Sequence, residues 1–288
     1  MKIKLLSFAF IATLISCGEA TTEENAGTET DAEVHVSDHQ VLDEGVEGNI
    51  DLVTSIVTKG GAKAADQQVI EDMLTSLESE KTVEGWESGV VGHWVGSFGK
   101  NKINISITKI DGENAEGFSV CAGNFRKIEG TVVPEDNGYT FVMNEPGNDQ
   151  YDGAFDFAVA KDLSGLTGSW TPFKKEGNTA KNYSLSKKEF TYNPNAGDYP
   201  ETSAKKLKYT DVENLDVEEL GYMRNEIYAR HGYSFKNKDW RYIFEGKDWY
   251  VPMGVDIRHQ LTDIEVENIG LIYEYESYFD EYYDEYGR

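Results

Sequence analysis

The middle of the chain alternates apolar and polar residues with a period of two, and this pattern constrains the fold more than any other feature. Ile103, Ile105 and Ile107 are separated by polar residues, and the alternation returns in 139–143 and in 155–159. Successive side chains of a β-strand point to opposite faces, so this period indicates strands that bury one face. The region is therefore predicted to form a β-sheet.

Short turn signals separate the apolar runs. They are Asp111-Gly112, Asp136-Asn137-Gly138, Asp152-Gly153 and Ser164-Gly165. Residues of this kind favour the tight turns of β-hairpins. Between Gly92 and Phe190 the pattern predicts about eight short strands at regular spacing, which is typical of an antiparallel sandwich or an up-and-down barrel.

The last part of the chain changes to the periodicity of helices. Asp216 and Glu219 have the spacing of a capping box, in which the two side chains satisfy free N–H groups at a helix start. Gly232 stands where a glycine ends a helix in the left-handed conformation. A second capping box, Thr262 and Glu265, predicts the start of the last helix. A small helical domain is therefore expected after the strands.

The N-terminus has the features of a secretory signal. Two lysines precede an apolar run, Leu5 to Ile15, that is too short to span a bilayer. Leu14-Ile15-Ser16-Cys17 resembles a bacterial lipobox, and this resemblance implies cleavage before Cys17 and acylation of its thiol. A simple secretory signal with an incidental cysteine is the other interpretation. With the lipobox, we expect a protein anchored by lipid in the cell envelope, in the outer membrane, on its periplasmic face or at the cell surface.

The charge of the chain argues against one class of partner. There are 52 acidic and 27 basic residues, which gives a net charge of -25. A surface this negative repels phosphate backbones, so nucleic-acid binding is not expected. It also repels anionic lipid headgroups, and the membrane partner is therefore expected to be reached through the lipid on Cys17.

Together these patterns predict an α+β multidomain protein, a small antiparallel β-barrel followed by a small, mostly helical domain. A proline-rich and glycine-containing stretch separates the two parts. The predicted segments are a signal peptide at 1–16, an acidic flexible tether at 17–48, a helical segment at 49–82, the barrel at 83–192, a linker at 193–203 and the helical domain at 204–288.

Two family resemblances follow from the motifs. The sequence Tyr228-Ala229-Arg230-His231-Gly232, with Arg-Asn-Glu before it and Trp249-Tyr250 after it, resembles the YARHG domain. That resemblance implies an extracellular module of the kind appended to bacterial lipoproteins, peptidases and kinases. It does not imply any particular activity. Gly92 and Trp94 at the first strand are loosely similar to the start of lipocalin or calycin barrels.

The candidate binding residues lie in the YARHG-like segment. They are Arg224, Tyr228, Arg230, His231, Trp249 and Tyr250. One interpretation is structural. The charged residues would form an internal network, since Glu226 and Arg230 are i,i+4 neighbours on a helix, and the aromatic residues would form the core. The other is a pocket for an anion such as a peptidoglycan stem peptide, or a stacking platform for sugars.

These features favour a non-enzymatic binding or interaction module with peptidoglycan, a glycan or an envelope protein as partner. An envelope hydrolase that uses Asp149, Asp152 and Asp156 on the barrel rim is one alternative, and a small-molecule carrier of lipocalin-like type is another. His35 and His39 have a metal-like spacing but lie in the acidic tether, so no metal site is expected, and no motif indicates a cofactor or a catalytic set. Cys121, in an apolar stretch, is expected to be a buried small hydrophobe.

Overall fold

The computed structural model describes residues 62–148, 151–174 and 179–282. All of them belong to one compact unit, Glu44–Arg288. Cys17, the predicted signal peptide and the acidic tether lie outside the described residues. Within the described ranges, no helix has the length and apolar character that a membrane span requires.

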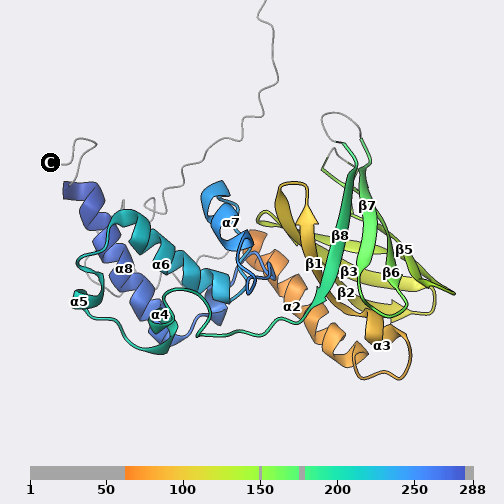
Figure 1. Ribbon diagram of the computed structural model, residues 1–288, viewed down its shortest axis with the longest axis horizontal. Helices are drawn as coiled ribbons and strands as arrows, with labels where there is room; N and C mark the ends of the chain where they lie inside the picture. The colour runs from red at the N-terminus through yellow and green to blue at the C-terminus, as the bar shows by residue number, and fades with distance from the viewer. Residues whose placement is uncertain (1–61, 149–150, 175–178, 283–288) are drawn as a thin grey trace, which may run out of the picture. The chain divides into compact units, whose positions relative to one another are not determined.

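Eight antiparallel strands form a closed barrel, which confirms the predicted architecture (Figure 1). Each strand pairs with its neighbours in the sequence, and β8 pairs with β1 to close the sheet. Closure removes the free strand edges that an open sheet would expose. The strands are β1 Gly92–Phe98, β2 Asn101–Asp111, β3 Asn114–Cys121, β4 Asn124–Glu135, β5 Gly138–Asn144, β6 Gly153–Ala160, β7 Leu166–Pro172 and β8 Lys181–Lys188.

The inward-facing side chains fill the lumen with one continuous apolar cluster. Trp94 is fully buried on β1, and Phe141 stacks on Phe157 with ring centroids 4.8 Å apart. The inward positions are the apolar positions of the period-two pattern, because alternate residues of a strand share a face. The lumen is therefore a packed core for most of its length, as small barrels usually are.

One end of the barrel is covered by a short helix, α3 Glu87–Val90. Trp86 stacks on Tyr139 with ring centroids 4.4 Å apart. The indole N–H of Trp94 donates to the carbonyl of Val90 at 3.0 Å. The opposite end carries the last residues of β1, β3, β5 and β7, and we call it the mouth.

The outer wall of the barrel is also buried where α2 Ala62–Glu80 crosses it. Ile70 and Met73 of this helix pack against Phe118 and Val120 of β3. This helix lies within the helical segment predicted at 49–82, and its contact explains why β3 has buried residues on both faces.

A buried polar chain lies on the same wall. Nδ1 of His93 is 2.8 Å from the hydroxyl of Ser106, which donates to Oδ1 of Asn104 at 3.2 Å. The amide of Asn104 donates to the carbonyl of Pro252, so the chain ends at the C-terminal region. Burial lowers the pKa of His93 to about 4, which keeps the imidazole neutral.

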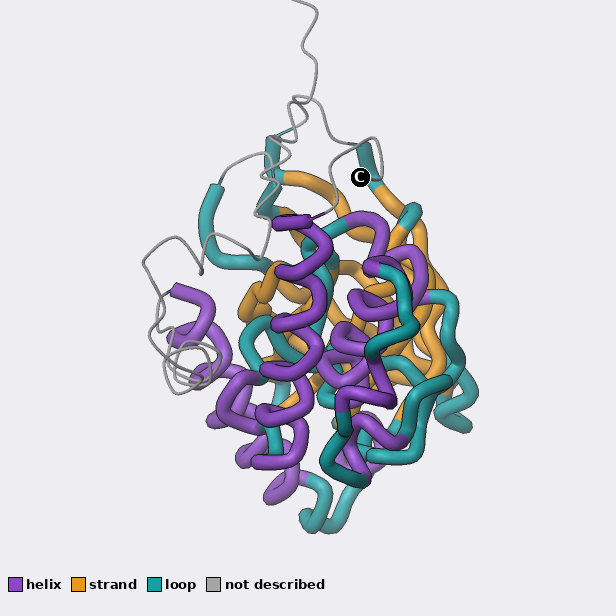
Figure 2. Tube along the Cα trace, turned by 90° about the vertical axis from the view of Figure 1, so that its left-hand side faces the viewer, coloured by secondary structure: helices purple, strands orange, loops and turns teal. Residues whose placement is uncertain are grey.

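The C-terminal region is helical, as predicted. Its helices are α4 Glu201–Ala204, α5 Tyr209–Val212, α6 Val217–Arg230, α7 Lys238–Glu245 and α8 Asp263–Tyr282, with a short 3-10 turn at Arg258–Gln260. Both predicted capping boxes are present, since Asp216 accepts from Glu219 N at 2.8 Å and Thr262 N donates to Glu265 at 2.9 Å. Helices α6 and α8 lie side by side in Figure 1, and Figure 2 turns the left-hand side of that view, which carries these helices, toward the viewer. Two contacts show that they run antiparallel: Arg224 contacts Glu276, and His231 at the end of α6 contacts Glu265 near the start of α8.

Candidate functional site

The arginines of the predicted site are held in internal ion pairs. Arg224 Nε donates to Glu276 at 2.9 Å, and both side chains are almost fully buried. Arg230 pairs with Glu226 at 2.7 Å, as the i,i+4 spacing predicted, and neither side chain is exposed. Carboxylates therefore already occupy both guanidinium groups.

Arg230 also holds the segment that was predicted as a linker. Its Nε donates to the carbonyl of Ala196 at 2.6 Å, and an Nη donates to the carbonyl of Tyr199 at 2.7 Å. Glu226 accepts from the backbone N–H of Asp198 and of Tyr199, both at 2.7 Å. The stretch before α4 is thus bonded to α6 along its length.

His231 and the start of α8 form a second internal network. Nε2 of His231 donates to Oε2 of Glu265 at 2.8 Å, and the ring stacks on Tyr192 at 4.4 Å. The other oxygen of Glu265 accepts from Tyr192 at 2.9 Å and from Ser203 at 2.6 Å. Burial alone would raise the pKa of Glu265, but the hydrogen bonds from His231, Ser203 and Thr262 lower it to about 2.

The glycine that ends the motif is required by its surroundings. Gly232 has a φ of +74°, in the left-handed region that the helix stop predicted. A Cβ there would lie 2.8 Å from Cβ of Met253. The carbonyl of Gly232 accepts from Met253 N at 2.7 Å, so the motif holds the segment that contacts the barrel wall.

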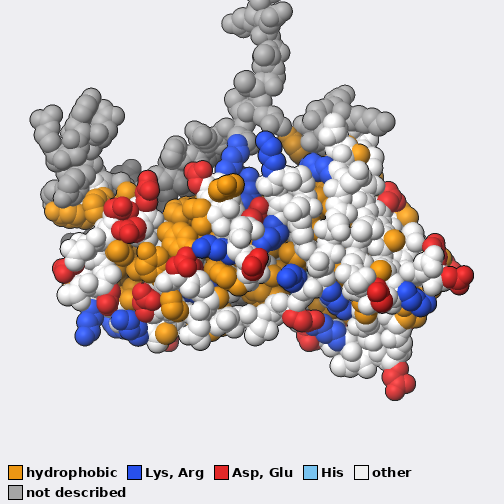
Figure 3. All heavy atoms as spheres, viewed as in Figure 1, with side chains coloured by type: hydrophobic (Ala, Val, Ile, Leu, Met, Phe, Trp, Pro, Cys, Tyr) orange, Lys and Arg blue, Asp and Glu red, His pale blue; other side chains and the backbone are white. Residues whose placement is uncertain are grey.

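The aromatic candidates mostly build the core of this region. Tyr250 is 2% exposed and donates its hydroxyl to the carbonyl of Tyr233 at 2.7 Å. Tyr228 and Trp249 are half-buried and pack against the same cluster. Hydrophobic side chains also gather over α6 and α7 on the face in Figure 3. Tyr242 of α7 is 85% exposed. Packing in this core accounts for the three aromatic candidate residues, Tyr228, Trp249 and Tyr250.

A cavity of about 390 Å³ lies at the mouth of the barrel. Its lining combines aromatic and charged side chains, and none of the six candidate binding residues is among them. The lining residues include Phe98, Arg126, Glu145, Phe155, Trp170 and Lys181. An apolar concave surface with a few polar groups is the usual form of a small-molecule site.

The acidic groups at the mouth have partners. Oε2 of Glu145 accepts from the indole N–H of Trp170 at 3.0 Å and from Gly153 N at 2.8 Å. Burial raises the pKa of Glu145. Asp152 is 6% exposed and lies 3.5 Å from Nε of Arg126. These contacts fix the polar side of the cavity.

The mouth was not predicted from the sequence, although strand β8 carries a usable signal for it. Inward-facing and outward-facing side chains alternate along β8, and Tyr183 and Leu185 are inward-facing core residues. Lys181 lies two residues before Tyr183. The period of two therefore places Lys181 on the inward face as well. A charged residue at the end of an inward-facing row indicates an opening to solvent rather than more core.

The rim carboxylates of the hydrolase alternative lie in different environments. The side chain of Asp156 is exposed on the outer face of β6, whereas Asp152 is buried beside Arg126. Asp149 lies outside the described residues. Cys121 packs against the lumen core, and burial raises the pKa of its thiol to about 12. In the described part of the chain, His, Cys, Asp and Glu form no group of three that suits a metal ion.

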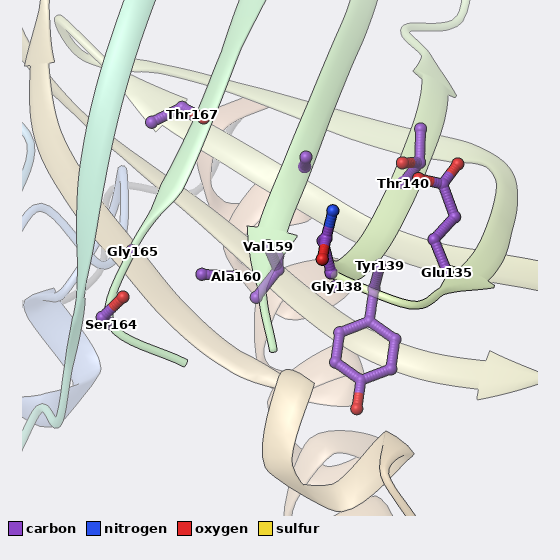
Figure 4. A pocket seen from close by; sticks show the side chains of 11 residues that line it. Glu135, Gly138, Tyr139, Thr140, Val159, Ala160, Ser164, Gly165 and Thr167 are labelled. Atoms are coloured by element: carbon purple, nitrogen blue, oxygen red, sulfur yellow. The ribbon is translucent and has the colours of Figure 1, made fainter. Parts of the chain in front are cut away.

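A second, smaller hollow of about 260 Å³ lies near the other end of the barrel. Apart from Glu135 and Tyr139, its lining side chains are short, and they include Thr140, Ser164 and Thr167 (Figure 4). Its lining contains one ionisable carboxylate, Glu135, and no cation. It offers less chemistry for recognition than the mouth.

Comparison with protein families identifies the C-terminal region. Residues 196–277 match the YARHG domain. The match begins at the residue whose carbonyl accepts from Arg230, so the segment before α4 belongs to the YARHG domain. No curated protein and no solved structure matches the chain. The lipobox and the likeness to lipocalins stay predictions.

Proposed function

We propose that this chain is a lipid-anchored protein of the cell envelope whose barrel binds a small organic ligand without chemical conversion. The observation that carries the binding role is the cavity at the mouth, which has aromatic walls of Phe98, Phe155 and Trp170. Below it the lumen is filled, so a ligand would be held at the end of the barrel and not inside it. The lipobox at Cys17 supports the location.

The YARHG domain has a supporting role in this proposal. Its two arginine pairs and its histidine are bonded inside the domain. Its 247–256 segment accepts bonds from the barrel, including those from Lys102 to the carbonyls of Lys247 and Tyr250. Val251 and Met253 pack on Val95 of the barrel wall. The domain thereby braces the wall from outside.

Binding at the mouth can be measured with phenylnaphthylamine, a neutral probe that fluoresces in apolar surroundings. We expect saturable fluorescence on addition of the full chain, with energy transfer from Trp170, which lines the cavity. The variant Trp170→Phe is expected to lose most of this transfer. Trp249→Phe, in the YARHG domain, is the control and should keep it. Transfer that is unchanged by Trp170→Phe would place the probe elsewhere and contradict the proposal.

The anchor is tested on the mature protein purified from membranes. Mass spectrometry is expected to show an N-terminal Cys17 that carries acyl chains. These chains would hold the protein at the membrane, because each buried methylene contributes about 0.8 kcal/mol to membrane binding. The variant Cys17→Ser should appear in the soluble fraction. An unmodified Cys17 in the mature protein would rule out this mode of attachment.

A further inference from the structure

We propose that the ligand at the mouth is an organic monoanion, whose carboxylate is bound by the ammonium of Lys181 and whose flat apolar body packs against Phe98 and Trp170. This inference rests on the proposed binding function and adds the chemical class of the ligand. Different outcomes of one probe experiment overturn the binding function and the ligand class.

Lys181 is placed inside the cavity with its hydrogen-bond donors unused. Its Nζ lies 4.8 Å from the ring centroid of Phe98 and 5.2 Å from that of Trp170. Within the described ranges, no carboxylate or carbonyl lies within bonding distance of this Nζ. The contrast is Lys187 on the same strand, whose Nζ donates to the carbonyl of Gly89. An ammonium has three donors, and a carboxylate is the acceptor that binds them most strongly.

The other charges at the mouth do not compete for this position. Arg126 is directed to Asp152, and Glu145 is bonded to Trp170 and Gly153. Among the described residues that line the cavity, Lys181 is thus the cation without an ion pair or a hydrogen bond to the protein, since Arg126 contacts Asp152 and the carbonyl of Phe125. The net charge of -25 acts against ligands with several negative charges, since long-range repulsion grows with ligand charge. A single carboxylate fits both conditions.

The apolar part of the ligand is indicated by the walls. Phe98 and Trp170 meet edge to face with centroids 6.2 Å apart, and Phe155 lies next to Phe98 at 6.3 Å. Three aromatic side chains around a cavity favour a flat or apolar partner, because offset and edge contacts between rings are attractive. The cavity of about 390 Å³ is near the lower limit for small-molecule sites, which favours a compact ligand.

A second observation is a buried hydroxyl close to the residues that line the cavity. Tyr183 is 6% exposed, and its hydroxyl is a buried polar group without a hydrogen-bond partner among the described residues. Its ring contacts Phe98 and Phe155, both of which line the cavity. Buried hydroxyls usually have partners, so this one is an unmet polar group in the layer of side chains next to those that line the cavity.

Three probes that share a naphthalene ring test the class of ligand: naphthoate, naphthalenemethanol and naphthylmethylammonium. Binding to the full chain is measured by quenching of tryptophan fluorescence. We expect naphthoate to bind on the order of tenfold more tightly than the alcohol, and the ammonium to bind most weakly. Lys181→Met should reduce the affinity for naphthoate to that for the alcohol, whereas Lys181→Arg should keep the preference.

The control is Lys188→Met, which removes the same charge from an exposed position of β8. It should leave all three affinities unchanged, and unfolding midpoints show that each variant is folded. Equal affinities for the three probes would overturn the anion proposal and leave binding at the mouth intact. Tighter binding of the ammonium would do the same and would point to Glu145 instead. If none of the probes binds, the proposed function fails as well.

Discussion

Replacement of Arg230 with methionine is expected to lower the free energy of unfolding by about 3–5 kcal/mol, the usual cost of removing one partner of a buried ion pair. The side chain of Arg230 is not exposed and donates five hydrogen bonds. The substitution leaves the carboxylate of Glu226 buried without its countercharge. It also frees the backbone around Ala196 and Tyr199, which begins the YARHG domain.

The measurement is urea unfolding of the full chain, followed by far-ultraviolet circular dichroism. The matched control is Arg241→Met, because Arg241 is half-buried and uses its guanidinium for the carbonyl of Lys236 at 2.9 Å. We expect the control to lose less than about 1 kcal/mol. If Arg230→Met were equally mild and instead abolished ligand binding, the arginine would belong to a binding site and the structural role would be wrong.

Acid is expected to remove up to about 3 kcal/mol of stability through Glu265 alone. The pKa of Glu265 is about 2 in the folded protein against an ordinary value of 4.5. A carboxyl whose pKa is lower in the folded state than in the unfolded state stabilises the fold at any pH above the unfolded value. The contribution from Glu265 is therefore complete above pH 4.5 and is lost as the pH falls towards 2.

The variant Glu265→Gln should already be destabilised near neutral pH, since an amide cannot accept all the bonds that His231, Tyr192, Ser203 and Thr262 donate. Its stability should also change less across the acid window. The control is Glu267→Gln on the same helix, because the side chain of Glu267 is 50% exposed and pairs with Lys206. The measurement is the unfolding midpoint of the unaltered chain and of both variants at several pH values between about 5 and 2. An unaltered acid profile in Glu265→Gln would show that other groups control it.

The features of the fold that depend on neighbours in the sequence were predicted correctly. Both capping boxes and the helix stop at Gly232 are set by residues within one turn of the helix end. The Glu226–Arg230 pair follows from i,i+4 spacing. The eight strands follow from alternation and turn residues, because inward and outward positions are two residues apart.

The partners of those residues could not be predicted. Arg230 lies one turn from Glu226 in the sequence, yet its other acceptors come from a stretch that reads as a flexible linker. His231 meets Glu265 only because α6 and α8 pack antiparallel. Contacts between segments far apart in the chain depend on how helices pack, and local periodicity carries no information about that packing.

By itself, the sequence determined the barrel strands, the helices with their caps, the YARHG motif and the strong negative charge. The tertiary structure alone decided where a ligand site can exist. Closure of the sheet brings Phe98 from β1, Trp170 from β7 and Lys181 from β8 around one opening. The same packing buries the conspicuous Arg and His residues of the motif among acceptors of their own domain. The reason is physical: a side chain is available to a ligand only if folding leaves its donors unpaired, and pairing depends on three-dimensional neighbours.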